Sequence, residues 1–371
     1  MNASFFQCTI PIGNPRPAAA GDGGSAAASA RPRILPVFMP FAGCPHRCLF
    51  CAQDKQTGAS PEPPGGSALR TLASLLHSLK AKRQAAQDTF RPVEIAFYGG
   101  TFTALPETVQ MACLARAAEG KKEGLVCRVR CSTRPDALTP RTLDALRAGG
   151  LDLVELGIQS FHTEALEVSQ RGYTGETARE GCRLMQDSGL ELGIQLLPGM
   201  PGSTPERFRE DVRNALAFSP ACLRFYPCLV VDGTPLATLW KKGAYGPWDT
   251  LTTVDALGGA LAEAWERRIP VIRLSVAPEA SFDAAVLAGP RHPALGSLIQ
   301  GEALFQTLRR NIEARGCPPT TLALPRFCQG FFFGHKKSLV ARWKTLGIDP
   351  GAVRWTTGEN AVLRWETATQ P

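Results

Sequence analysis

The stretch Phe41-Ala-Gly-Cys44-Pro-His-Arg-Cys48-Leu-Phe-Cys51 is the segment from which the chain is best interpreted. Its three cysteines have C-x3-C-x2-C spacing, and residues 34–39 before them predict a buried strand. Three thiolates on the loop leaving that strand can converge on one metal centre. A structural zinc ion normally takes four ligands, usually as two short pairs, and no second C-x2-C or H-x3-H pair follows downstream. The spacing therefore predicts a metal centre with one open coordination position; a zinc knuckle and a chance clustering of thiols are the alternatives.

Length and composition predict a globular protein with one large domain and a smaller appendage. The chain has 371 residues, of which 44% are hydrophobic and 20% charged. No apolar run approaches the ~18–20 residues of a membrane span. The N-terminus lacks a basic start followed by a hydrophobic stretch, so we expect a cytoplasmic protein without a membrane partner.

Nine further cysteines are scattered through the chain and form no second compact triad. In a large chain with no export signal we expect them to be free, buried thiols rather than disulfides. A second cluster assembled from distant cysteines is the alternative.

Strands and helices alternate about six times along the middle of the chain. This pattern favours an α/β fold with a parallel sheet, which right-handed crossovers would curl toward a barrel. Active sites in such folds lie at the C-terminal ends of the strands. The strands are expected at 34–39, 93–98, 125–132, 153–158, 190–197, 221–226 and, as an outlying strand, 269–276. The helices are expected at 68–83, 105–119, 140–148, 163–169, 175–188, 205–218 and 249–268.

The ends of the chain differ from this pattern. Residues 1–33 are predicted to be a flexible leader, because 13–33 are rich in Gly, Pro, Ala and Ser. The barrel is expected to span 34–290, and 291–371 to form a small α+β extension. In that extension we expect a helix at 296–315, a strand at 327–333, a helix at 338–344 and a hairpin of 353–355 with 361–365.

The C-terminal extension is basic. Residues 301–371 carry ten Lys/Arg and five Asp/Glu, a net charge of +5 out of the chain's +8. A basic surface attracts polyanions, so this region is a candidate for RNA binding. A solvated surface without a partner is the alternative.

The cysteine spacing, with the aromatic Phe50 before Cys51, resembles the signature of the radical S-adenosylmethionine (SAM) superfamily. Residues 34–230 resemble the radical SAM core of the elongator catalytic subunit family, and more distantly the oxygen-independent coproporphyrinogen oxidases. The resemblance implies a partial (β/α)6 barrel. It also implies that Cys44, Cys48 and Cys51 bind a [4Fe-4S] cluster whose fourth iron binds SAM. Phe50 is then expected near the adenine of SAM.

The resemblance also implies residues that contact SAM at the strand ends. Gly99-Gly100-Thr101 follows a strand directly, and glycines let the backbone approach a ligand closely. In the superfamily such a motif offers carbonyl groups to the methionine ammonium. Thr133, in Ser132-Thr133-Arg134-Pro135-Asp136, belongs to a stretch in which this chain has Ser132 where the elongator family has a glutamate.

Three more residues are assigned by the same resemblance. Gln159 and Arg171 match residues that contact the ribose and carboxylate of SAM, and an arginine fork suits a carboxylate. Gln195 stands before the Pro198-Gly199-Met-Pro201-Gly202 turn, where the porphyrin relatives have an aspartate for the ribose.

Two histidine-containing segments fit no acid–base pattern. They are Leu287-Ala-Gly-Pro-Arg-His292-Pro293 and Gly334-His335-Lys336-Lys337. Both resemble stretches in uncharacterised bacterial relatives of the elongator subunit. We interpret His335 as a surface or core histidine, with a substrate contact as the alternative.

Together these features predict a radical SAM enzyme. It is expected to cleave SAM reductively, with an electron from a donor such as flavodoxin or ferredoxin, and to form a 5′-deoxyadenosyl radical. The basic extension and the elongator resemblance favour a tRNA base as substrate. A small molecule, as in the porphyrin relatives, is the alternative within this class, and a non-catalytic zinc or RNA-binding protein is the alternative outside it.

Overall fold

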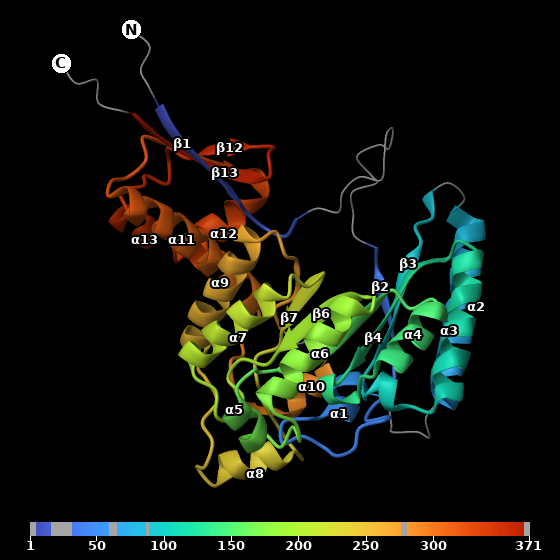
Figure 1. Ribbon diagram of the computed structural model, residues 1–371. Helices are drawn as coiled ribbons and strands as arrows, with labels where there is room; N and C mark the ends of the chain where they lie inside the picture. Colours follow the sequence, from blue (N-terminus) through green and yellow to red (C-terminus); the bar gives the residue numbers. More distant parts are fainter. Residues whose placement is uncertain (1–4, 16–31, 59–64, 87–88, 276–279, 367–371) are drawn as a thin grey trace, which may run out of the picture. The chain divides into compact units, whose positions relative to one another are not determined.

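The computed structural model describes residues 5–15, 32–58, 65–86, 89–275 and 280–366 (Figure 1). The chain divides into two compact units. The larger unit comprises 16–247 and 276–289, and the smaller comprises 1–15, 248–275 and 290–371. In the described ranges no helix is both long and apolar enough to cross a bilayer.

The larger unit is built on six parallel strands that lie in the sheet in sequence order. The strands are β2 (Ile34–Phe38), β3 (Val93–Tyr98), β4 (Val126–Thr133), β5 (Leu153–Gln159), β6 (Glu191–Leu196) and β7 (Cys222–Phe225). The main crossover helices are α2 (Gly66–Ala86), α3 (Glu107–Lys122), α4 (Pro140–Ala148), α5 (Thr163–Val168), α6 (Gly175–Asp187) and α7 (Pro205–Ala217). These elements confirm the predicted alternation of strand and helix, and the fold is α/β.

Local sequence signals explain where several of these helices begin. Thr139, Thr174 and Thr204 are N-caps whose hydroxyl oxygens accept a backbone N–H three residues later. Proline occupies the first turn of α4 and α7, where its missing N–H costs nothing. Figure 1 shows α4 and α6 lying along the strands that they connect.

Shorter elements complete the larger unit. They are α1 (Gln53–Thr57), β8 (Val230–Val231), α8 (Pro235–Lys241), α10 (Ala280–Ala285), β10 (Val286–Ala288) and two 3-10 turns, η3 (Phe102–Ala104) and η4 (Pro135–Ala137). Strands β8 and β10 pair antiparallel. The sequence predicted none of these elements, because each is too short to show a periodic pattern.

The two faces of the parallel strands differ in polarity. On one face Phe97 stacks on Phe102, and Phe225 meets Phe208 of α7 edge to face. Side chains of alternate residues on the other face are charged or phenolic. Glu155 binds Arg224 (Nε to Oε2, 2.6 Å), Arg130 (3.1 Å) and the Tyr98 hydroxyl (2.6 Å), and Arg130 also pairs with Glu94. This buried network joins β3, β4, β5 and β7 across the sheet.

The smaller unit contains a mixed sheet with strand order β1-β13-β11-β12 and several helices. The strands of this sheet are β1 (Phe5–Pro11), β11 (Thr321–Pro325), β12 (Arg354–Thr356) and β13 (Asn360–Glu366). The unit also contains the short strand β9 (Val271–Arg273), which does not belong to this sheet. The helical elements are α9 (Thr250–Glu266), α11 (Leu295–Arg315), η5 (Arg326–Cys328), α12 (Gln329–Phe333), η6 (His335–Lys337) and α13 (Val340–Thr345).

Three expectations for the chain ends differ from the structure. Residues 5–11, within the predicted leader, form β1 and pair with β13; most of the remaining leader lies outside the described residues. The aromatic run at 327–333 is helical rather than a strand, because Phe332 stacks on Trp343 (4.6 Å between ring centroids) as part of one helical turn. Strands β12 and β13 form no hairpin, since β11 lies between them and pairs with both.

Candidate functional site

The three cysteines lie on the loop that leaves the C-terminal end of β2. Two tight turns shape this loop: Cys44 N–H donates to the Phe41 carbonyl (3.0 Å) and Cys51 N–H to the Cys48 carbonyl (3.1 Å). The side chain of Cys48 is buried, whereas Cys44 and Cys51 are half-buried. The compact backbone therefore holds the three thiols on one short, partly accessible segment.

The Gly99-Gly100 turn after β3 packs directly against the cysteine loop. A Cβ on Gly100 would lie 2.1 Å from the Ala42 carbonyl oxygen, so only glycine fits there, and its φ of +73° also favours glycine. The Ala42 carbonyl accepts from Thr101 N–H at 2.7 Å. Gln53 joins the same two segments, because its Oε1 accepts from Phe41 N–H (2.6 Å) and from Gly100 N–H (3.0 Å).

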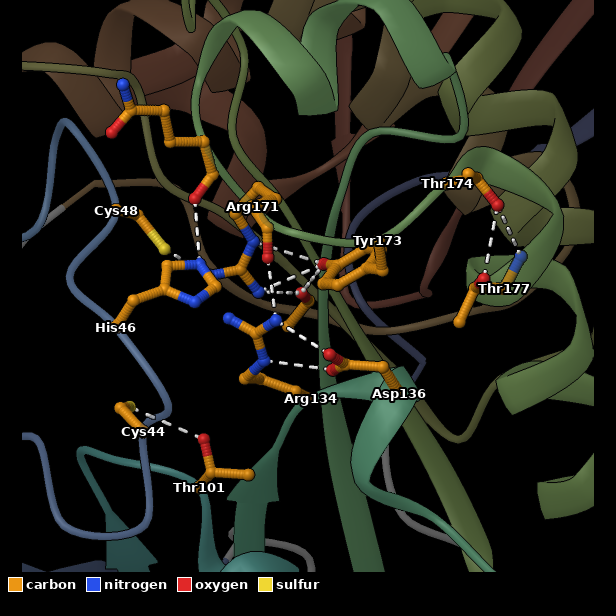
Figure 2. Close-up of polar contacts among 12 residues, drawn as sticks. Cys44, His46, Cys48, Thr101, Arg134, Asp136, Arg171, Tyr173, Thr174 and Thr177 are labelled. Atoms are coloured by element: carbon orange, nitrogen blue, oxygen red, sulfur yellow. Dashed lines mark hydrogen bonds and ion pairs between the residues drawn. The ribbon is translucent and has the colours of Figure 1, made fainter.

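Two of the expected SAM-contacting residues reach cysteine sulfurs (Figure 2). The Thr101 hydroxyl lies 3.4 Å from Cys44 Sγ, and the Arg171 guanidinium donates to Cys48 Sγ at 3.0 Å. The structure thus brings both residues to the thiols across long stretches of sequence. Thr101 is 57 residues from Cys44, and Arg171 is 123 residues from Cys48.

A hydrogen-bonded frame fixes the position of Arg171, which is buried. Its guanidinium donates to the Gly157 carbonyl (2.8 Å) and to the Tyr173 hydroxyl (2.9 and 3.1 Å). Arg134 donates to the Arg171 carbonyl (2.6 Å) and is itself held by a two-point pair with Asp136 (2.9 and 2.7 Å). Figure 2 shows both guanidinium groups on the Cys48 side of this cluster of polar contacts.

The segment around Arg171 also secures the cysteine loop from the other side. His46 Nε2 lies 2.9 Å from the Gln170 carbonyl oxygen, and Leu49 N–H donates to the Ser169 carbonyl. A Cβ on Gly172 would meet the His46 ring at 2.6 Å. The close fit of these segments limits how far the loop can move.

Burial determines the protonation of the thiols. Burial, with smaller contributions from the neighbouring thiols, raises the pKa of Cys51 to about 12, and burial raises the pKa of Cys44. Burial opposes charge on Arg171, but Tyr173 and Cys48 outweigh it and raise the arginine pKa. A buried cation beside the three cysteines suits a centre that carries negative charge, and binding of a metal centre would displace the protons of Cys44 and Cys51.

Three thiols on one short loop are a donor set that either a zinc ion or an iron–sulfur cluster can use. Within the described ranges, no three His, Cys, Asp or Glu side chains are arranged to hold one metal ion. A single zinc ion would need its thiolates to meet around one atom at ~2.3 Å, whereas a four-iron cluster takes one thiolate at each of three irons.

Two of the remaining expected site residues lie near Arg171, because the Gln159 amide nitrogen, the Thr133 carbonyl oxygen and the Arg171 guanidinium all lie close to Gly157. Gln195 donates to the Gln159 side-chain oxygen (3.3 Å), so these two meet at the ends of β5 and β6. Gln159 has a φ of +65°, unusual for a residue other than glycine. The Thr133 hydroxyl contacts the Thr103 hydroxyl at 2.6 Å and is not brought to the thiols. Phe50 is half-buried on the cysteine loop.

Sequence reasoning did not assign several residues that organise the site. Arg134 stands next to Thr133 in a stretch that was singled out, and its position there was the available signal. Tyr173 likewise stands two residues after Arg171, in the stretch Arg171-Gly172-Tyr173-Thr174 that resembles the same families. Gln53 gave no comparable signal, because its role depends on contacts between two segments.

Comparison with protein families identifies two domains in the chain. The model of the radical SAM superfamily matches residues 38–215, and that of the Radical_SAM C-terminal domain matches residues 220–303. The first match contains the three cysteines, the Gly99-Gly100 turn and Arg171.

Curated relatives and solved structures agree with this result. The chain is 29% identical over 260 residues to the tRNA uridine(34) acetyltransferase of Methanocaldococcus infernus, with 61% of this chain and 48% of the relative covered. It is 32% identical over 250 residues to that of Methanocaldococcus jannaschii, with 58% and 46% covered. The chain therefore spans about half the length of these relatives.

A solved structure shows the same fold. The archaeal Methanocaldococcus infernus Elp3 with an N-terminal deletion matches with a TM-score of 0.55 and 22% identity, covering 77% of this chain and 64% of that one. The parallel strands with helical crossovers accordingly form a curled half-barrel. From the two matched domains and this shared fold, the chain belongs to the radical SAM superfamily and is a radical SAM enzyme.

Proposed function

We propose that this enzyme holds a [4Fe-4S] cluster on Cys44, Cys48 and Cys51, binds SAM beside it and modifies a tRNA base. The superfamily implies SAM and an iron–sulfur cluster. The main support for the cluster is the loop with its three thiols. This loop packs against the Gly99-Gly100 turn, and Arg171 donates a hydrogen bond to Cys48. With both groups bound, the cluster held by the three cysteines would pass one electron from an external donor to SAM. Cleavage of the C5′–S bond would release methionine and a 5′-deoxyadenosyl radical able to take a hydrogen atom from the substrate.

The chain's own residues then bind and orient SAM. The backbone at Gly99 and Gly100 is proposed to face the methionine ammonium, with Thr101 beside it. Arg171 is proposed to serve the carboxylate as well as Cys48, since a guanidinium has five N–H donors. Gln159 and Gln195 are proposed for the ribose, Thr133 for a backbone contact, and Phe50 for the adenine.

The similarity to the tRNA uridine(34) acetyltransferases supports tRNA as the substrate class. Because the chain spans about half of those relatives, their complete reaction is not part of this proposal. The net charge of +5 over residues 301–371 also favours a polyanionic partner. The proposal includes a cytoplasmic location and an external one-electron donor such as flavodoxin or ferredoxin.

Anaerobic reconstitution tests the cluster and SAM assignment. We expect a brown protein with about four irons per chain, and release of 5′-deoxyadenosine from SAM after reduction with dithionite or methyl viologen. Cys48→Ala should lose the iron, whereas Cys317→Ala, which removes an exposed thiol, should keep it. A colourless protein with one zinc would support the non-catalytic alternative, and a full cluster that never cleaves SAM would refute the proposed chemistry.

The substrate is tested in the same reaction. Total tRNA should increase 5′-deoxyadenosine formation and should yield a nucleoside of altered mass on digestion. If tRNA has no effect while extracted small metabolites increase SAM cleavage, the small-molecule alternative is correct.

A further inference from the structure

Two segments without a role in the radical SAM site come together in the smaller unit. They are 290–293 and 334–337, which are separated by the whole of α11 in the sequence. The rings of His292 and His335 meet edge to face with 5.2 Å between their centroids and 84° between their planes. Two histidine segments that showed no relation in the sequence therefore form one local surface.

The contacts of His292 fix its hydrogen-bonding capacity. Its Nδ1 lies 3.0 Å from Ala294 N–H and accepts that hydrogen. In the neutral ring the hydrogen is then on Nε2, which makes that atom a donor. His292 is half-buried and His335 is exposed. This edge of the imidazole pair therefore has a donor to offer to a ligand.

The two lysines after His335 have an unusual backbone conformation. Lys336 and Lys337 are both left-handed, with φ of +52° and +62°, and both side chains are exposed. The turn is held by the bonds Lys337 N–H to the Gly334 carbonyl and Leu339 N–H to the Phe333 carbonyl, and Leu339 is buried. Strained conformations of this kind persist where the surrounding structure enforces them, and they concentrate at functional positions.

Among the residues that the structure describes, some basic residues of the smaller unit are paired with carboxylates, and the two lysines are not. Arg342 pairs with Glu302, and Arg310 with Glu266. Over the described parts of the chain, neither Lys336 nor Lys337 forms an ion pair. Two ammonium groups without a carboxylate partner among the described residues, beside two imidazoles, favour binding of an anion. Because these donors are exposed and not enclosed in a pocket, they suit the phosphate groups of a nucleic-acid strand more than a small molecule.

We propose that His292, His335, Lys336 and Lys337, here called the His–Lys patch, bind the phosphodiester backbone of tRNA. The proposal rests on the proposed function in taking tRNA as the partner. It adds the site of contact: two ammonium groups neutralise phosphates, and the imidazole N–H groups donate to phosphate oxygens. Contacts of this kind position an RNA without reading its sequence.

The test measures binding of total tRNA to the full-length protein by fluorescence anisotropy between 50 and 200 mM salt. The main variant is Lys336→Gln with Lys337→Gln. The matched control, Lys344→Gln with Arg354→Gln, removes two exposed positive charges from the same unit outside the patch. Circular dichroism and the melting temperature check that each variant is folded.

Counterion release sets the expected size of the effect. Each lost lysine–phosphate contact should lower the slope of log affinity against log salt by about one. The affinity lost by the Lys336/Lys337 variant should therefore be about tenfold larger at 50 mM than at 200 mM salt, and the control should change the slope by less than half as much. A second variant, His292→Gln with His335→Gln, should weaken binding severalfold and change the slope less than the Lys336/Lys337 variant does, because it removes the imidazole N–H donors and leaves both ammonium groups in place.

The outcomes separate this proposal from the proposed function. If the parent protein binds tRNA and the Lys336/Lys337 variant keeps its affinity and slope, the His–Lys patch is wrong while tRNA remains the substrate. An equal loss in the control variant would also refute the patch, since the effect would then follow net charge alone. If the parent fails to bind tRNA even at 50 mM salt, both the patch and the RNA part of the proposed function are refuted.

Discussion

Replacing Arg130 with methionine tests the buried charge network that joins the strands. Arg130 lies between Glu94 and Glu155, and the three side chains are only 5–8% exposed. Glu155 keeps the Arg224 ion pair and the Tyr98 hydrogen bond in the variant. Glu94 has its described side-chain contact with Arg130 alone, so it is left as an unpaired, buried carboxylate.

The size of the effect follows from the unpaired carboxylate of Glu94. Removing one partner of a buried ion pair lowers the free energy of unfolding by about 3–5 kcal/mol. At roughly 2–4 °C per kcal/mol for a unit of this size, the melting temperature should fall by about 6–20 °C. Glu94→Leu combined with Arg130→Met removes both charges and should restore most of that loss, to within about 1–2 kcal/mol of the parent.

Differential scanning calorimetry of the parent, the single and the double variant measures the loss of stability and its recovery. A double variant as unstable as the single one would refute the argument from the unpaired carboxylate and leave lost packing as the cause.

Three further outcomes test other parts of the larger unit. Gly100→Ala places a Cβ 2.1 Å from a carbonyl oxygen of the cysteine loop and should cut the iron bound on reconstitution severalfold, whereas Gly150→Ala, with a similar φ but open space, should retain it. Burial raises the pKa of Asp211 from 3.8 to about 6. A folded-state pKa above the unfolded one means that stability falls by about 2 kcal/mol as pH rises from 4 to 6. Asp211→Asn should remove that dependence in urea titrations, and an unchanged pH profile would contradict it. Arg171→Met removes a cationic donor to Cys48. The variant should therefore lower the midpoint potential of a bound cluster by about 60 mV, a factor of ten in the equilibrium constant for one electron. A redox titration followed by electron paramagnetic resonance measures the potential, and an unchanged value would contradict this prediction.

The positions of the parallel strands could be predicted because each strand is a short apolar run between helical patterns. Residues 93–98 and 153–158 match β3 and β5 to within one residue. The cysteine loop and the Gly99-Gly100 turn were predicted to be close because adjacent parallel strands end at the same edge of a sheet. Here local pattern and topology give the same answer, and the structure agrees.

Other features depend on partners that are remote in the chain. Strand β1 is a strand because Phe5–Pro11 pair with Asn360–Glu366, at the opposite end of the sequence. The aromatic residues at 327–333 suit a strand by propensity, but the turn packs Phe332 on Trp343 and becomes helical. The contact of His292 with His335 also could not be predicted, because nothing in either segment indicates that the two lie together in the fold.

The charge network also bears on how accurately the site is held. Tyr98 is the last residue of β3 and directly precedes Gly99, and its hydroxyl donates to Glu155 of β5 at 2.6 Å. Arg224 of β7 contacts both Tyr98 and Glu155. Apolar packing tolerates small shifts between neighbouring strands, whereas a buried network is stable only when each partner is in place. The polar contacts of Tyr98 therefore fix the position of Gly99 and Gly100 relative to the cysteine loop. It follows that the Glu94/Arg130 double replacement, which leaves Tyr98, Glu155 and Arg224 intact, should preserve iron binding even where Arg130→Met alone destabilises the fold.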